Sequence, residues 1–417
     1  MKQIESLAEA MQVLLAYSPQ DMKEHYSLGR VEKLLKELGS PQETFKSVHI
    51  AGTSGKTSTS YFIRGMLQKA GQRTGLTVSP HIVAINERVQ IDGQPLPEHT
   101  FLNYLNIFLP LVEATNLKPT YFELVIAFAY WVFAKEKVDY AVIEVGLGGL
   151  LDATNTIKRE DKLCVISDIG LDHTEILGTT IAAIAAQKAG IVQPGNHVII
   201  QHQSVEATTV IEEKARAQNA SYEYVQEIEM PSILPDFQRR NFALALTAYT
   251  YIKTRDNLSE LSASDYENIA HETPPGRWEI YKINQKTVIL DGAHNPQKME
   301  MLVGTYMSQY SQPAAVLANL VEAPEEKLIQ TLKILKPITS RLIIPDFLAG
   351  QDLKSRHSVD PDAFEKLAAQ TGFTHIEKEP DVQKALDTLV KQPEGTLLIT
   401  GSLYLISLVR PYLQKLV

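Results

Sequence analysis

The alternation of short β-branched segments with segments of helical periodicity is the feature that most constrains the fold of this chain. The first such segment, residues 47–51, has the composition of a strand, and a glycine-rich loop and a helix ending near Gly71 are predicted to follow it. Further strands are predicted at residues 75–78, 139–145, 163–169 and 197–200. Because strands and helices alternate in this way in parallel sheets, we expect an α/β fold.

A break in the pattern divides the chain near residue 277. Residues 205–271 are predicted to be mostly helical, and the following Thr273-Pro274-Pro275-Gly276 cannot continue a helix and has the composition of a linker. The alternation then resumes, with strands predicted at residues 287–290, 314–320, 341–344 and 396–400. At 417 residues the chain is too long for a single core. We therefore expect two domains, residues 1–277 and 278–417.

The composition excludes several classes of function. The 40 basic and 49 acidic residues give a net charge of −9, which argues against a general binder of nucleic acid or of anionic membranes. Cys164 is the only cysteine, so an intrachain disulfide and cysteine-based metal sites are ruled out. The N-terminus has no signal-peptide core, and the longest uncharged apolar run, residues 124–134, is shorter than the roughly 18 residues of a membrane span. We expect a soluble, cytoplasmic protein in which this run is a buried helix.

The strongest single signal is the loop between the first predicted strand and its helix. The glycines let backbone N–H groups turn toward an anion, and the helix N-terminus adds its positive end. Lys56 would reach the β- and γ-phosphates of a nucleotide, and the Thr57 or Ser58 hydroxyl would meet phosphate or Mg²⁺. The residues predicted to bind ATP here are Gly52, Thr53, Ser54, Gly55, Lys56, Thr57 and Ser58. The alternative is a glycine turn with a solvated lysine, because Ile50 stands where the eight-residue signature has its first glycine.

Longer motifs accompany this loop in a fixed order along the chain. They are residues 79–82 (SPHI), 86–89 (NERV), 144–149 (EVGLGG), 152–155 (DATN), 170–174 (GLDHT), 188–191 (KAGI), 275–277 (PGR), 291–296 (DGAHNP) and 401–405 (GSLYL). In order and spacing they resemble the folylpolyglutamate synthase/dihydrofolate synthase family, a branch of the Mur ligase superfamily, from about residue 27 to the C-terminus. Several long motifs in one order are far more specific than a single loop.

The resemblance implies an N-terminal P-loop ATPase domain with a mainly parallel sheet and a smaller C-terminal Rossmann-like α/β domain. It also implies an enzyme that uses ATP and Mg²⁺. ATP would phosphorylate the carboxylate of a folate or dihydropteroate, and the amine of L-glutamate would attack the acyl phosphate in a ligase reaction. Two alternatives remain open: a Mur-type ligase that adds an amino acid to another acceptor acid, and a nucleotide-binding regulator that has lost catalysis.

The resemblance assigns magnesium ligands to Ser79, Glu144 and His173. Each lies near the end of a predicted strand, where open α/β sheets bind ligands. An imidazole on Mg²⁺ is unusual by ligand type, so the assignment of His173 rests mainly on the resemblance. On the residues themselves, Glu144 could form an ion pair at the sheet edge and His173 could pair with Asp172.

The remaining roles are also implied by the resemblance. Lys188 would be carbamylated and, with Lys56 and His173, catalytic, although a lysine in the last turn of a helix is also the ordinary partner of the helix dipole. Further ATP contacts are assigned to Asn241, Arg277 and Asp291, and substrate contacts to Pro80, His81, Asp152, His294 and Ser402. The Asn295-Pro296 pair following His294 also has the form of a helix N-cap.

The sequence departs from the family pattern at a few positions. Leu150 stands where the family usually has arginine, Gln187 where it often has glutamate, and Thr57 where it commonly has glycine. The substrates expected are small molecules, namely ATP, L-glutamate and a pterin acid or folate, with no nucleic-acid or membrane partner. A chain of two complete domains can stand as a monomer, which is the state we expect.

Overall fold

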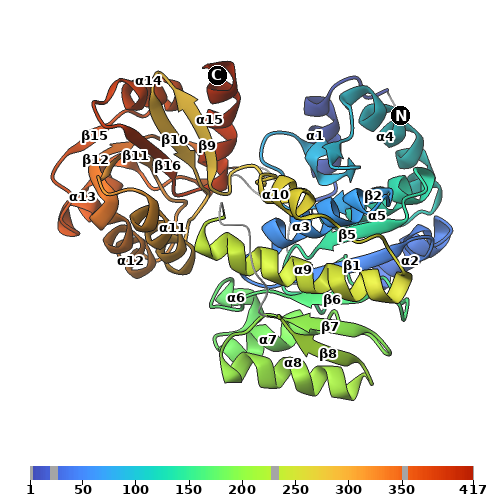
Figure 1. Cartoon of the computed structure of the whole chain (residues 1–417). Coiled ribbons are helices and arrows are strands. Elements are labelled where there is room, and N and C mark those ends of the chain that lie inside the picture. Colours follow the sequence, from blue (N-terminus) through green and yellow to red (C-terminus); the bar gives the residue numbers. More distant parts are fainter. Residues whose placement is uncertain (1–2, 19–26, 227–233, 350–355, 417) are drawn as a thin grey trace. The chain divides into compact units, whose positions relative to one another are not determined.

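The computed structural model describes residues 3–18, 27–226, 234–349 and 356–416, and the chain divides into two compact units, Met1–Glu272 and Thr273–Val417 (Figure 1). The second unit begins at Thr273, whereas the predicted second domain begins at residue 278. The backbone explains the earlier start, because the Gly292 N–H donates to the Gly276 carbonyl oxygen at 2.9 Å within the second unit.

The first unit is built on an eight-stranded sheet with the order β4-β3-β2-β5-β1-β6-β7-β8. Its strands are β1 (Lys46–Ala51), β2 (Thr74–Thr77), β3 (Gln90–Ile91), β4 (Gln94–Pro95), β5 (Tyr140–Glu144), β6 (Leu163–Ile166), β7 (His197–Ile200) and β8 (Ser221–Tyr224). The pairs from β2 to β8 are parallel, and β3 and β4 add an antiparallel edge. The predicted mainly parallel sheet is confirmed.

Helices cover both faces of this sheet. They are α1 (Leu7–Leu15), α2 (Gly29–Glu37), η2 (Pro41–Glu43), α3 (Lys56–Lys69), η3 (Ile85–Arg88), α4 (Glu98–Ala114), α5 (Tyr121–Lys135), α6 (Thr174–Leu177), α7 (Ile181–Ala189), α8 (Val205–Ala217), α9 (Asp236–Asp256) and α10 (Ala263–Ala270). Successive side chains of a strand point to opposite faces, so Val142 of β5 packs in the core with α3 and α9, whereas Ala141 and Ile143 pack in the core with α4 and α5.

Helix α5 contains the apolar run predicted to be a buried helix, and that prediction is confirmed. Thr120 caps the helix by accepting from the Glu123 N–H, and the Glu123 carboxylate accepts from the Thr120 N–H at 2.6 Å. Its side chains from Leu124 to Tyr130 are all buried. In the described part of the chain, no helix combines the length and the apolar character needed to cross a membrane.

The second unit has a six-stranded sheet with the order β15-β12-β11-β16-β10-β9, parallel except for the β9/β10 hairpin. Its elements are β9 (Glu279–Ile283), β10 (Lys286–Leu290), α11 (Pro296–Gln309), β11 (Ala314–Ala318), α12 (Glu325–Leu335), η4 (Lys336–Ile338), β12 (Thr339–Ile344), β13 (Leu348–Ala349), β14 (Arg356–His357), α13 (Pro361–Gln370), β15 (Ile376–Lys378), α14 (Val382–Lys391), β16 (Thr396–Thr400) and α15 (Leu403–Leu416). The two mainly parallel sheets confirm the α/β fold.

The observed strand ends differ from the predicted ones in a few places. Strand β6 ends at Ile166, three residues before the predicted end at 169, because residues 167–170 turn to bond with the glycine loop. Strand β8 was predicted as part of a helical region, but it forms a partly exposed sheet edge. Strand β9 was not predicted; it pairs with β10 through a turn in which Asn284 and Gln285 have φ values of 48° and 66°. Residues 227–233 of the predicted helical region lie outside the described residues.

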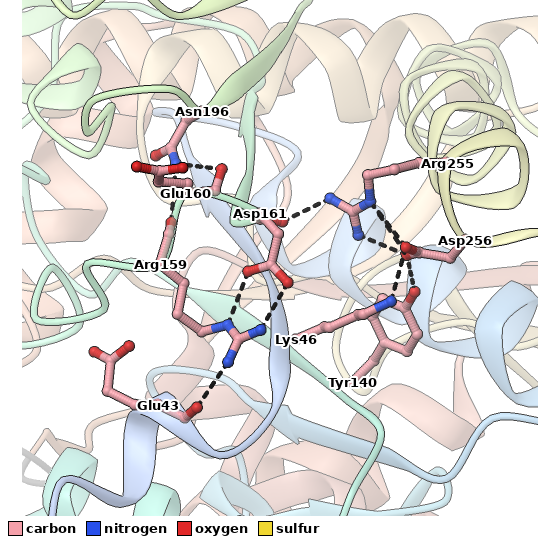
Figure 2. A network of polar contacts seen from close by, with 9 residues as sticks. All are labelled: Glu43, Lys46, Tyr140, Arg159, Glu160, Asp161, Asn196, Arg255 and Asp256. Atoms are coloured by element: carbon pink, nitrogen blue, oxygen red, sulfur yellow. Dashed lines mark hydrogen bonds and ion pairs between the residues drawn. The ribbon is translucent and has the colours of Figure 1, made fainter.

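A polar network fixes the C-terminal end of α9 to the amino ends of the central strands. Asp256 accepts from Lys46 Nζ at 2.7 Å and from the Tyr140 hydroxyl, and Arg255 Nη1 donates to the Asp161 carbonyl oxygen at 2.6 Å (Figure 2). The remaining members are Glu43, Arg159, Glu160 and Asn196. With 21 residues, α9 is roughly 30 Å long, so this anchor leaves its N-terminal turns at the opposite, carboxyl edge of the sheet.

Candidate active site

The glycine loop between β1 and α3 presents the N-terminus of α3 at the carboxyl edge of the sheet. Gly55 caps α3 with φ 86°, and a Cβ atom there would lie 2.3 Å from Asn241 Oδ1, so both the conformation and the close approach require glycine. The first N–H groups of a helix have no intrahelical acceptor and carry the positive end of its dipole. The N-terminal turn of α3, which includes Lys56, Thr57 and Ser58, is therefore suited to binding an anion.

Two lysines converge on one backbone oxygen of this loop. Lys56 Nζ donates to the Gly52 carbonyl oxygen at 3.1 Å, and Lys188 Nζ donates to the same oxygen at 2.9 Å. Lys188 is 4% exposed and lies in the last turn of α7, as predicted. The structure therefore places both predicted catalytic lysines at the mouth of the phosphate loop.

Thr57 and Glu144 form the pair best suited to hold a cation. The Thr57 hydroxyl donates to Glu144 Oε1 at 2.9 Å, and Glu144 is 3% exposed at the end of β5. The contact follows from topology, since β1 and β5 are parallel neighbours with Ile50 opposite Glu144. A hydroxyl and a carboxylate at the end of a phosphate loop are oxygen ligands of the kind that Mg²⁺ prefers.

A second loop, residues 167–170 after β6, braces the phosphate loop. The Thr53 and Ser54 N–H groups donate to the Asp168 carbonyl oxygen at 2.8 and 3.2 Å, and the Ser167 hydroxyl donates to the Ser54 carbonyl oxygen at 2.7 Å. The Thr53 hydroxyl is bonded to the Gly170 backbone. These two N–H groups already donate within the protein, so they are not available to a phosphate. Any ATP contact of Thr53 or Ser54 would involve other atoms of these residues, and such contacts stay predictions.

Asn241 and Gln238 form a buried polar pair near the N-terminus of helix α9. Asn241 Nδ2 donates to Gln238 Oε1 at 3.1 Å, and both residues are buried. In the described part of the chain, Gln238 Nε2 and the Ser54 hydroxyl are buried without a hydrogen-bond partner. Buried polar groups ordinarily find partners, so these two atoms fit a site completed by a bound polar ligand such as a nucleotide.

Residues 79–81 follow β2, the parallel neighbour of β5, and so lie at the same edge of the sheet. Ser79 and Pro80 are partly exposed and joined by a cis peptide bond. His81 is 4% exposed, and its Nδ1 accepts from Arg88 Nε at 3.0 Å. A magnesium contact of Ser79 and substrate contacts of Pro80 and His81 stay predictions.

His173 lies seven residues beyond the end of β6, immediately before the short helix α6. It has φ 50°, and its side chain is 54% exposed. The pairing with Asp172 involves the backbone, because the His173 N–H donates to Asp172 Oδ1 at 3.2 Å. No three His, Cys, Asp or Glu side chains gather as metal ligands among the described residues. A magnesium contact of His173 stays a prediction.

Asp152 lies beneath the loop at residues 146–149 that follows Glu144. It is 3% exposed and accepts from the Leu147 N–H at 2.8 Å, the Thr154 N–H at 3.0 Å and the Thr154 hydroxyl at 2.5 Å. Burial raises the pKa of Asp152, and these donors oppose the rise. Its carboxylate organises the loop, and a substrate contact of Asp152 stays a prediction.

The Thr154 hydroxyl links this carboxylate to His49 on β1. Burial, with a smaller effect of Lys162, holds the pKa of His49 well below 6.5, so its ring is neutral. Because the Thr154 hydroxyl donates to Asp152, His49 Nε2–H donates to Thr154 Oγ1 at 2.9 Å. The strand that carries the phosphate loop is thereby tied to the loop after β5.

In the second unit, Arg277 lies just before β9 and Asp291 just after β10, the two strands of the antiparallel hairpin. Asp291 accepts from the Trp278 and Ala293 N–H groups, each at 2.9 Å. Burial raises the pKa of Asp291, and the positive charge of Arg277 opposes the rise. The nucleotide contacts predicted for Asp291 and Arg277 stay predictions.

His294 and Ser402 lie just before helices α11 and α15 of the second unit. His294 Nδ1 bonds the Gly292 carbonyl oxygen at 2.7 Å, and Lys298 Nζ lies 3.2 Å from Nε2. The predicted N-cap is confirmed, since Asn295 Oδ1 accepts from the Lys298 N–H at 2.9 Å. Ser402 is 2% exposed, and its hydroxyl accepts from the Tyr404 N–H. Substrate contacts of His294 and Ser402 stay predictions.

The residues that were not predicted from the sequence support the site indirectly, by holding its loop and side chains in place. Ser167, Asp168 and Gln238 brace the phosphate loop or its neighbour Asn241. The signal for Gln238 was present, because Gln238 and Asn241 are three residues apart in a predicted helical region and so lie on the same face of the helix. Ser167 and Asp168 follow a strand that was predicted to run through them, so their turn was hidden.

Comparison with known proteins finds family matches in both parts of the chain. Residues 50–232 match the Mur ligase middle domain, and residues 277–412 match the dihydrofolate synthetase C-terminal domain. The chain is 34% identical to the dihydrofolate synthase/folylpolyglutamate synthase of Bacillus subtilis, over 93% of this chain and 95% of that protein. It is 30% identical to the folylpolyglutamate synthase of Lacticaseibacillus casei, over 91% of this chain and 93% of that protein.

Solved structures agree with these relatives. The structure of E. coli FolC in complex with DHPP and ADP has a TM-score of 0.82 and 25% identity, and covers 100% of this chain and 99% of FolC. The Mycobacterium tuberculosis folylpolyglutamate synthase complexed with ADP and AMPPCP has a TM-score of 0.82 and 25% identity, over 97% of this chain and 99% of that chain. This chain therefore belongs to the folylpolyglutamate synthase/dihydrofolate synthase family of the Mur ligase superfamily.

Proposed function

We propose that this chain joins L-glutamate to the carboxylate of a folate or of dihydropteroate. Its family makes it an ATP-dependent ligase, which confirms the predicted enzyme class and the requirement for ATP and a divalent metal. The observation that carries the proposal is the arrangement of Lys56, Lys188, Thr57 and Glu144 around one loop at a helix N-terminus.

The reaction separates into two displacements. An oxygen of the acceptor carboxylate attacks the γ-phosphorus of ATP, and ADP leaves with the electrons of the broken bond. The glutamate amine then attacks the acyl carbon, phosphate leaves, and the amine loses a proton. The N–H groups at the start of α3 and the ammonium of Lys56 would hold the phosphates and stabilise the charge that develops on them.

Thr57 and Glu144 would hold Mg²⁺ with Ser79 and His173. When bound, the cation would draw negative charge from the phosphate oxygens. The buried Glu144 carboxylate supplies the negative charge, while Thr57 Oγ1 contacts that carboxylate at 2.9 Å and supplies a second oxygen. Asp152 keeps the following glycine loop folded, so that Glu144 stays at the sheet edge.

Carbamylation of Lys188 relieves a conflict of charge within the loop. Two ammonium groups on the same Gly52 carbonyl oxygen repel each other. If the neutral Lys188 amine adds to CO₂ and loses a proton, the product is an anion beside the Lys56 cation. Lys188 is 4% exposed, which would shelter this carbamate from water.

We assign contacts with the nucleotide to Asn241, Arg277 and Asp291. We assign contacts with the other substrates to Pro80, His81, Asp152, His294 and Ser402. We also infer that the chain is a cytoplasmic monomer of two domains, with ATP binding assigned to residues 1–277 and glutamate ligation to residues 278–417.

Incubation of the pure protein with ATP, Mg²⁺, labelled glutamate and either pterin acid tests this function. We expect labelled product with at least one acceptor, and a loss of product of roughly 100-fold or more in Lys56→Ala, because a phosphate-binding cation is removed. Lys69→Ala, at the other end of α3, is the matched control and should retain activity.

Absence of product from both acceptors would refute the assignment. ADP release that depends on another acid and ignores pterins would instead support a Mur-type ligase with a different acceptor. Product made by the wild type but not by Lys56→Ala would exclude a regulator without catalysis.

A further inference from the structure

Strands β1 and β6 are parallel neighbours, so the loops that follow them leave the sheet side by side. The Ser167 N–H donates to the Ala51 carbonyl oxygen at 2.9 Å, which continues the strand pairing by one residue. A Cβ atom at Gly52 would lie 1.9 Å from the Ser167 hydroxyl oxygen. The phosphate loop and the loop at residues 167–170 therefore pack as one unit, with glycine required at the contact.

The first part of the second loop is fixed from outside the phosphate loop. Asp168 Oδ1 accepts from Arg240 Nη2 at 2.6 Å, and Arg240 also donates to the His202 carbonyl oxygen at 2.9 Å. The Ile169 N–H donates to Gln203 Oε1 at 2.8 Å. Residues 168 and 169 are thus held by α9 and by the segment after β7.

Gly170 is held by Thr53 of the phosphate loop. The Thr53 hydroxyl donates to the Gly170 carbonyl oxygen at 3.0 Å and accepts from the Gly170 N–H at 3.1 Å. Beyond Gly170 the chain turns outward, and from 171 to 180 the buried residue is Leu177, which packs near Gly148. His173 lies in this segment, three residues after the Thr53 contact.

We propose that Thr53 is a positioning residue that couples occupancy of the phosphate loop to the placement of the His173 loop. When nucleotide occupies the phosphate loop, it restricts Thr53 further, and the two bonds between Thr53 and Gly170 pass this restriction to the turn that leads to His173. The role of Thr53 would then be indirect, since its hydroxyl is engaged with Gly170 and its N–H with Asp168. The inference rests on the proposed function in treating His173 as part of the site.

Hydrogen exchange measured by mass spectrometry tests the coupling without turnover. The wild-type chain would be compared with and without saturating AMPPCP, first in EDTA, so that a metal cannot bridge His173 to the nucleotide. We expect AMPPCP to slow exchange in peptides spanning 52–58 and also, by roughly fivefold, in peptides spanning 170–178. The α6 amides report on the second peptide, because the Ile176 and Leu177 N–H groups bond the His173 carbonyl oxygen.

Matched variants separate the hydroxyl from the shape of the side chain. Thr53→Val keeps the shape of the side chain and loses both bonds, whereas Thr53→Ser keeps the hydroxyl. Thr59→Val is the control, because within the described part of the chain the buried Thr59 hydroxyl makes no hydrogen bond. We expect Thr53→Val to retain protection of 52–58 and to lose that of 170–178. In Mg²⁺ its kcat should fall roughly tenfold with the KM for ATP changed less than about threefold, and Thr53→Ser should restore both readouts.

The outcomes are distinguishable from failure of the proposed function. If AMPPCP and Mg²⁺ATP protect neither peptide, the nucleotide site itself is wrong, and the coupling falls with it. If wild-type 52–58 is protected and 170–178 is unchanged, the coupling is wrong while the ligase assignment stands. Unchanged coupling in Thr53→Val would likewise overturn the role of Thr53. The wild-type comparison decides the question even where a variant does not fold.

Discussion

At the scale of single residues, Lys162 is the buried charge with the clearest physical consequence. Its side chain is 0% exposed, and its Nζ donates to the carbonyl oxygens of Ile157 at 3.1 Å and Ile191 at 2.8 Å. Burial lowers the pKa of Lys162 from 10.5 to about 8. The two carbonyl oxygens supply dipoles but no full negative charge, so they compensate only part of the desolvation.

Lys162 therefore gives the first unit a pH-dependent stability. Between pH 8 and 10.5 the unfolded chain keeps the Lys162 proton that the folded chain releases, so stability rises with pH across this window and is lost as pH falls toward 8. Relative to Lys162→Met, the wild type should gain roughly 1–2 kcal/mol between pH 7.5 and 9.5. Urea unfolding of the first unit at both pH values measures this. Lys158→Met, at a half-exposed lysine, is the control, and parallel pH profiles for wild type and Lys162→Met would contradict the account.

The role of a residue was predictable where it depends on neighbours in the sequence. It was less predictable where it depends on residues that only the fold brings close. Asn295 was predicted as an N-cap because the cap and its helix are adjacent in the sequence, and the structure confirms it. Thr57 was predicted to meet phosphate or Mg²⁺, but its pairing with Glu144 comes from the neighbouring positions of β1 and β5. Strand order is not visible in one sequence, so that contact could not be predicted.

At the scale of elements, the end of α7 and the loop after β5 hold each other in place. The Leu150 N–H donates to the Gln187 carbonyl oxygen at 2.7 Å, and Asn155 Nδ2 donates to the carbonyl oxygens of Leu150 at 3.1 Å and Gly190 at 3.0 Å. Leu150 departs from the family pattern, yet the hydrogen bonds here use only its backbone. The contact positions the helical turn that carries Lys188.

Gly190 is the position where this packing can be tested. A Cβ atom there would lie 2.5 Å from Leu150 Cβ and 2.6 Å from Leu150 Cα, atoms that the Asn155 bonds keep from moving away. We expect Gly190→Ala to cost roughly 1–3 kcal/mol of stability and, by displacing Lys188, to lower kcat at least about tenfold. Gly29→Ala at the start of α2 is the control, since nothing lies within 4 Å of its Cβ. Wild-type kcat in a folded Gly190→Ala protein would show that the contact does not position Lys188.

The fold of the elements was largely predictable, and β8 and β9, which were not predicted as strands, share a cause. Strands with continuous apolar runs, such as β7 and β16, were predicted with their observed bounds, because burial on both faces leaves a clear signal. Strands β8 and β9 lie at sheet edges with partly exposed side chains, so their polar residues resemble helix or loop. Whether such a segment forms a strand depends on its pairing in the folded protein, which a single sequence does not show.

At the scale of the whole molecule, the connection between the units is short and each end bonds to its own unit. Glu272, the last residue of the first unit, accepts from Arg64 Nη2 at 2.6 Å, and Arg64 has a side chain only 5% exposed. In the second unit, the Gly276 N–H donates to Glu279 Oε2 at 3.0 Å. Each unit also has its own sheet with a buried core, which is the anatomy of an independently folding domain.

We therefore expect residues 1–272 and 273–417, produced separately, each to fold on their own, with a cooperative melting transition and a stability in the usual range of about 5–15 kcal/mol. The 1–272 fragment should bind AMPPCP, because Lys56, Lys188 and Glu144 all belong to it, but it should not ligate glutamate, because Arg277, Asp291 and His294 lie in the other fragment. Circular dichroism, calorimetric binding and the labelled-glutamate assay check these points, with the full chain as control. A 273–417 fragment without a melting transition would show that its core needs the first unit, and ligation by 1–272 alone would remove the second unit from the reaction.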